Sequence, residues 1–88
     1  MTFNRIIKKL EKMDKTKKCI GEFWKVFGVP IIKMEIKDCK INVVTGKNDN
    51  EGLSVGEMIN FLKLLANRDW IECKKVMEFN NFCVFYFE

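Results

Sequence analysis

The chain has 88 residues, which is enough for one small domain, residues 1–88, and leaves little room for a second hydrophobic core. Hydrophobic residues make up 48% of the chain and charged residues 32%, a balance that predicts a folded domain rather than a disordered segment. There is no histidine, so catalytic triads and Cys–His pairs that need an imidazole base are excluded.

The first 18 residues carry the positive charge. They hold seven Lys or Arg residues against two Asp or Glu residues, a net charge of +5, whereas residues 19–88 have a net charge of −1. Apolar residues recur here at spacings of three and four, which predicts an amphipathic helix over residues 3–14. The outward face and the connector after it form a candidate basic binding surface: Arg5, Lys8, Lys9, Lys12, Lys15, Lys17 and Lys18.

Residues 18–28 and 31–44 are rich in β-branched and aromatic side chains and predict two antiparallel strands. We expect the chain to turn at Val29 and Pro30. In that register one face holds apolar residues such as Phe23 and Phe27, and Trp24 lies on the other. Beyond Asp38 the alternation of apolar residues changes parity, which suggests a bend or bulge.

A second helix is predicted after the polar loop of residues 45–52. Ser54 stands at the N-cap position and Glu57 three residues later, the spacing of a capping box. The apolar stripe that follows is wide, which favours deep burial, and it includes Leu64 at its margin. We expect this helix to end at Asn67 or Arg68.

Two strands over residues 70–79 and 82–87 close the chain, with Asn80 and Asn81 in a tight turn. The expected register pairs Val76 with Phe85, Met77 with Val84 and Phe79 with Phe82. The complete prediction is an α+β domain in the order α-β-β-α-β-β, with antiparallel hairpins and both helices packed on one sheet face. The opposite face then has no cover, and its aromatic and aliphatic residues form a candidate partner-binding site: Trp24, Trp70, Val76, Phe85 and Phe87.

No catalytic residue, metal site or cofactor is expected. Ser54, the lone serine, is explained as a helix cap. The four cysteines lack a C-x-x-C pair, so we interpret them as reduced, structural thiols rather than zinc ligands: Cys19, Cys39, Cys73 and Cys83.

The chain has no apolar stretch long enough to span a membrane and no signal-peptide core. We therefore expect no membrane association and a cytoplasmic location. The abundance of Lys, Ile, Asn and Phe over Ala, Arg and Pro matches A/T-rich codons, which indicates a bacterial, archaeal or phage-infected cell.

The leading hypothesis is a non-enzymatic binding protein that blocks or regulates a larger protein or nucleoprotein complex. In size and character the whole chain resembles the compact inhibitors that phages and mobile elements encode against host defence, anti-CRISPR proteins among them. That resemblance implies steric or charge-based blockade.

Two alternatives remain. The helix from Ser54 and the hairpin over residues 70–87 resemble the last helix and wing of winged-helix proteins, which implies a nucleic-acid-binding regulator, although this helix carries only Lys63 and Arg68 as cations. The other alternative is a homodimer that buries the aromatic sheet face as part of a larger assembly.

Overall fold

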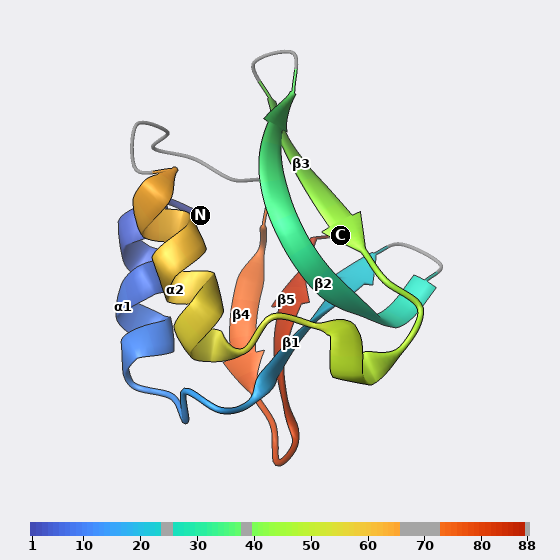
Figure 1. Ribbon diagram of the computed structural model, residues 1–88. Helices are drawn as coiled ribbons and strands as arrows, with labels where there is room; N and C mark the ends of the chain where they lie inside the picture. Colours follow the sequence, from blue (N-terminus) through green and yellow to red (C-terminus); the bar gives the residue numbers. More distant parts are fainter. Residues whose placement is uncertain (24–25, 38–39, 66–72, 88) are drawn as a thin grey trace.

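The computed structural model describes residues 1–23, 26–37, 40–65 and 73–87. Figure 1 shows two helices beside a strongly curved sheet. The elements follow in the order α1 (Phe3–Glu11), β1 (Lys18–Phe23), β2 (Val26–Lys37), β3 (Lys40–Thr45), the short 3-10 turn η1 (Asp49–Glu51), α2 (Val55–Leu64), β4 (Lys75–Glu78) and β5 (Phe82–Tyr86). The predicted α+β class is confirmed, and the element order differs by one additional strand before α2.

The described strands form one mixed sheet in the order β3-β2-β1-β5-β4. β1 runs parallel to β5, pairing Lys18 with Phe82 and Cys19 with Cys83, while the other neighbouring strands pair antiparallel. Strands that follow each other along the chain pair antiparallel, as in the predicted hairpins. The parallel contact between the two halves of the chain was not predicted, because it joins residues far apart in sequence. The expected register of the last hairpin is confirmed, with Val76 opposite Phe85 and Met77 opposite Val84.

The predicted turn at Val29 and Pro30 is wrong. β2 continues through these residues, and Phe23 pairs directly with Val26. Gly28 has a φ of 63°, a backbone conformation that glycine adopts without the clash of a Cβ atom. The Gly-Val-Pro segment thus lies inside a long curved strand (Figure 1). The bend or bulge expected beyond Asp38 begins outside the described residues; the strands on either side of it pair antiparallel, with Ile36 of β2 opposite Ile41 of β3.

Both helices begin where the sequence predicts. The Thr2 hydroxyl accepts a hydrogen bond from Arg5 N at 3.3 Å and caps α1. The capping box of α2 is complete: Glu57 N donates to Ser54 Oγ at 3.1 Å, and Ser54 N donates to Glu57 Oε1 at 3.1 Å. Leu64, which was expected to widen the buried stripe, is 82% exposed because it lies beyond the margin of the packed face.

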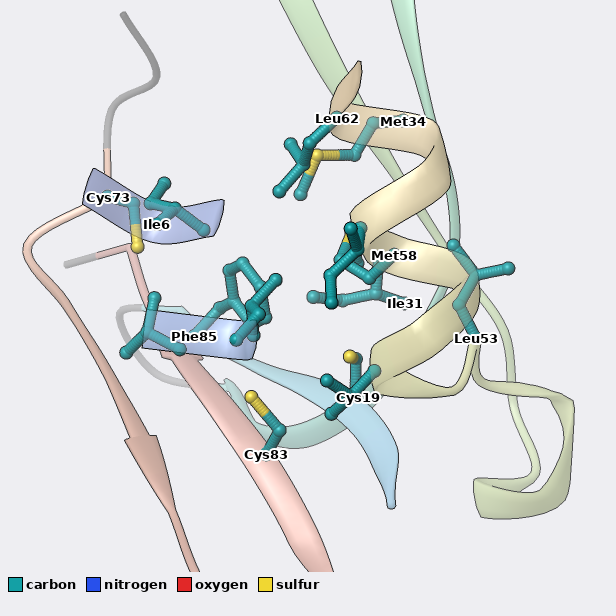
Figure 2. Packing of buried hydrophobic residues seen from close by; sticks show 14 of the residues in the cluster. Ile6, Cys19, Ile31, Met34, Leu53, Met58, Leu62, Cys73, Cys83 and Phe85 are labelled. Atoms are coloured by element: carbon teal, nitrogen blue, oxygen red, sulfur yellow. The ribbon is translucent and has the colours of Figure 1, made fainter. Parts of the chain in front are cut away.

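The core joins both helices to four strands, β1, β2, β4 and β5 (Figure 2). One buried cluster contains Ile6 and Leu10 of α1 and Met58 and Leu62 of α2. Its strand residues on β1, β4 and β5 are Cys19, Val76, Cys83 and Phe85. We call these four strand positions the core face of the sheet. Within the described residues the core contains no buried polar or charged side chain, so burial of apolar surface is its main source of stability.

The thiols of the core act as packing groups. Cys19, Cys73 and Cys83 are free and buried. A hydrogen bond with Cys83, together with burial, raises the pKa of the Cys19 thiol, and burial raises the pKa of Cys73. The Cys19 and Cys73 thiols therefore stay protonated at neutral pH, as expected of structural rather than reactive cysteines.

Replacing the buried ring of Phe85 tests this core. We expect Phe85→Ala to lower the free energy of unfolding by about 3–5 kcal/mol, because it removes a fully buried aromatic side chain and leaves a cavity. Leu64→Ala is the matched control on an exposed apolar residue and should change stability by less than about 0.5 kcal/mol. Urea unfolding followed by circular dichroism measures both, and equal effects of the two substitutions would contradict the assigned core.

Candidate binding surfaces

The predicted aromatic partner site does not form as expected. Val76 is 2% exposed and Phe85 is fully buried, so neither side chain is available to a partner in this fold. Phe87 is half-buried and its ring stacks on Phe23 with a centroid distance of 4.8 Å. Trp24 and Trp70 lie outside the described residues.

The parallel pairing of β1 with β5 explains the correction. Side chains alternate between the two faces of a strand. Because Cys19 pairs with Cys83 and both thiols are buried, Phe85 points to the core face two residues further along β5. Val76 is opposite Phe85 and shares that face. The residues of β4 and β5 that the sequence interpretation left uncovered, Val76 and Phe85, therefore lie in the buried cluster, which also contains residues of both helices.

The basic residues of α1 lie where the sequence predicts. Arg5, Lys8, Lys9 and the C-cap residue Lys12 are exposed. Arg5 lies three and four residues before Lys8 and Lys9, and these lie four and three residues before Lys12, so the four form one stripe away from the buried Ile6 and Leu10. We call these four residues the α1 stripe. Within the described residues, none of the four side chains takes part in an ion pair.

Three other predicted basic residues have structural contacts or a sheet position instead. Lys15 Nζ donates to the carbonyl oxygens of Glu11 and Met13 at 2.5 and 2.8 Å, and so satisfies acceptors at the end of α1. Lys17 Nζ pairs with Glu78 Oε2 at 3.0 Å and donates to the carbonyl of Phe79 at 2.7 Å. Lys18 is half-buried at the start of β1. The sequence alone does not separate these three from the α1 stripe.

Contacts at both ends hold α1 alongside β4. The Met1 ammonium group donates to the carbonyl of Cys73 at 3.0 Å, just before β4 begins. At the other end, Asp14 N donates to Glu78 Oε2 at 3.0 Å, where β4 ends. The α1 stripe is therefore carried on an element that hydrogen bonds fix near both of its ends rather than on a loose arm.

Electrostatics distinguishes the stripe from a neutral helix surface. Lys8 and Lys9 lie in the last turn of α1, where cations interact favourably with the helix dipole. Arg5 lies near the amino end, where a cation is unfavourable, and the first turn has no acidic residue to balance it. Helix stability therefore accounts for the charge of Lys8 and Lys9 but not for that of Arg5.

Comparison with known proteins adds no template for these surfaces. No family model, curated protein or solved structure matches this chain. The function of the chain is therefore inferred from the properties of its own surfaces.

Two further observations concern the part of the chain that the structure describes. It contains no helix with the length and apolar character that crossing a membrane requires. Its Cys, Asp and Glu side chains form no cluster of three or more suited to holding a metal ion.

One surface was not identified from the sequence. Met77 is 40% exposed and Phe79 is 46% exposed, on or beside the face of β4 opposite the core face. The apolar run Phe82–Tyr86 has no polar residue to mark its outer side, so its pattern does not show which face is buried. The sequence does contain one signal for the outer face, because Lys75 pairs with Tyr86 and places a charge on the same side of the sheet as the Tyr86 ring.

Glu78 makes the anchor of α1 sensitive to pH. The hydrogen bond from Asp14 N and the contact with Lys17 lower the pKa of the Glu78 carboxyl. A lowered pKa means that folding favours the ionised form, so the stabilisation is complete above the ordinary glutamate pKa of about 4.3 and is lost as the pH falls through the lowered value.

We expect Glu78→Gln to lower stability only slightly at neutral pH, as is usual for a partly exposed ion pair. The difference from the wild type should shrink as the pH falls from about 6 to 3. Thermal unfolding across this range is the measurement, with Glu11→Gln as a control that removes an exposed carboxylate of α1 itself. A Glu78→Gln deficit that stays constant with pH would show that the carboxylate does not anchor α1.

Proposed function

We propose that this chain is a non-enzymatic binding protein that docks the α1 stripe on a polyanionic surface of a larger nucleoprotein or protein complex, and so blocks or regulates that complex. The observation that carries the proposal is the set of four exposed cations, without an ion pair in the described residues, on a helix anchored at both ends. A fixed array of cations attracts phosphates and carboxylates without conformational change.

The composition of the stripe favours one kind of contact. Three of its four residues are lysines, which act as point charges and lack the two-pronged geometry with which arginine reads a guanine edge. Binding of this kind follows charge density rather than base sequence. We therefore propose phosphate groups of a nucleoprotein complex as the primary target, with an acidic protein surface as the competing target.

The α1 stripe is a better candidate than α2. Val55, Met58, Ile59 and Leu62 of α2 are buried, and Lys63 is the cation that this helix presents. A winged-helix protein would need that helix to enter a DNA groove. The alternative of a regulator that reads DNA through α2 therefore has less support than docking through α1.

The size of the chain supports the narrower proposal of an inhibitor. With 88 residues and no histidine, it is suited to occupying a surface rather than to acid–base catalysis on a bound substrate. An inhibitor of host defence encoded by a phage or mobile element would act in this way. It would cover a negatively charged site on its target, rich either in phosphate groups or in acidic side chains.

Charge reversal on the stripe tests the proposal. We expect the wild type to bind fluorescein-labelled duplex DNA or RNA with a dissociation constant on the order of 1–100 μM near physiological salt, and to bind more tightly at lower salt. Lys8→Glu with Lys12→Glu should weaken binding at least about tenfold and reduce the slope of log K against log salt by about 2, since each lysine releases about one counterion. Fluorescence anisotropy from 50 to 200 mM salt measures both quantities.

The matched control is Lys47→Glu with Lys74→Glu, which changes the net charge by the same amount at exposed positions after β3 and before β4. This variant should retain most of the affinity. Equal weakening by both pairs would mean that net charge, and not the α1 stripe, determines binding. Absence of DNA and RNA binding by the wild type at 50 mM salt would exclude phosphates as the target and favour the acidic protein surface.

A further inference from the structure

We propose that two copies of this chain pack the outer faces of their sheets against each other around a two-fold axis that runs along β5. The outer face is the side opposite the core face. Its residues are Lys18, Ile20 and Glu22 on β1, Phe82, Val84 and Tyr86 on β5, and Lys75 and Met77 on β4, with Phe79 just after β4. This surface is separate from the α1 stripe, so the proposal does not depend on the proposed function.

Alternation along the strands defines this face. Cys19, Cys83 and Phe85 point into the core cluster, so their neighbours Ile20, Val84 and Tyr86 point the other way. Val84 supports the assignment, because it is only 7% exposed and yet lies outside the core cluster. The Lys75 ammonium group lies 4.6 Å from the centre of the Tyr86 ring, which places both on the same side.

The register arranges these residues in three rows across β4, β5 and β1. One row reads Lys75, Tyr86, Glu22; the middle row reads Met77, Val84, Ile20; and the third ends in Phe82 and Lys18. Phe79 extends the third row, because its N–H donates to the carbonyl of Phe82 at 2.8 Å. Apolar residues therefore occupy the centre, and charges occupy three of the corners.

Exposure shows that the apolar residues around Val84 have only partial cover in one copy of the chain. Met77 and Phe79 are 40% and 46% exposed. Ile20, Phe82 and Tyr86 are half-buried, and none of them packs against the core cluster. Burying such a surface against a second apolar surface is favourable, at roughly 25 cal/mol for each Å² removed from water.

Charge complementarity identifies a second copy as the occupant. A two-fold axis along β5 in the plane of the interface places β4 of one copy over β1 of the other. Lys75 then faces Glu22 of the second copy, and the symmetry repeats this pair on the other side of the axis. Along the axis Val84, Tyr86 and Phe82 meet their own equivalents, while Met77 meets Ile20 and the Phe79 ring meets Lys18.

An unrelated partner would not need this arrangement. Lys75 lies on the strand to one side of β5, and Glu22 lies in the same row on the strand to the other side. Rotation about an axis along β5 exchanges these two positions, so each charge meets the opposite charge of the second copy. Sheets packed face to face cross at about 30°, a rotation that displaces neighbouring strands by less than the spacing between rows. The pairing of the rows is therefore compatible with ordinary sheet packing.

The experiment measures mass against concentration by sedimentation equilibrium. We expect the wild type to pass from 10.4 kDa to twice that mass as its concentration rises through the micromolar range. Lys75→Glu and Glu22→Lys should each raise the dissociation constant at least about tenfold, because each brings like charges together across the interface. The double variant, Glu22→Lys with Lys75→Glu, restores opposite charges and should return to within about threefold of the wild type.

Two more variants separate this face from general stickiness. Met77→Asp places a charge in the centre of the interface and should prevent dimerisation, whereas Leu64→Asp changes an exposed apolar residue of α2 and should leave the dimer intact. Circular dichroism confirms that each variant is folded. A mass of 10.4 kDa up to about 0.5 mM, failure of the double variant to restore the dimer, or equal effects of Met77→Asp and Leu64→Asp would each overturn the proposal.

Discussion

The parallel contact between β1 and β5 joins the two halves of the chain and determines which side chains become core. It brings Lys18 beside Phe82 and Cys19 beside Cys83, and it makes β5 an inner strand of the sheet. Next to the paired thiols, Gly21 has no side chain, and the rings of Phe23 and Phe87 occupy the space that a Cβ atom would need. A contact between segments so far apart in sequence is costly in chain entropy, and the apolar surface that it buries must offset that cost.

This contact also decides the character of both surfaces. One side of β4 and β5 is committed to the helices, so the other side keeps Met77 and Phe79 exposed next to charged residues at its corners. The helices in turn present their polar sides outward, and α1 carries the basic stripe. The protein thus has an apolar surface on the sheet and a cationic surface on α1. Apolar surfaces suit stable association, and clustered cations suit salt-dependent capture of anions.

Lysines serve two purposes in this chain. Lys15 and Lys17 bond to backbone carbonyls, and Lys17 also pairs with Glu78, so their charge helps to position α1. The α1 stripe makes no such contacts within the described residues. A sequence pattern counts these lysines alike, because the distinction depends on whether the end of β4 lies within reach of the connector. Contacts across sixty or more residues, such as that of Lys17 with Phe79, are not visible in local spacing.

Local interactions along the chain were enough to predict the start of both helices, the Ser54–Glu57 capping box and the pairing of Val76 with Phe85, because each involves residues close in sequence. Tertiary packing selected the strand order, the reversal after Phe23 in place of the expected turn at Val29 and Pro30, and the buried side of the last hairpin. In Phe82–Tyr86 every residue is apolar, so either side was able to face the helices. The parallel partner β1 made that choice, since it fixes Cys83 opposite the buried Cys19.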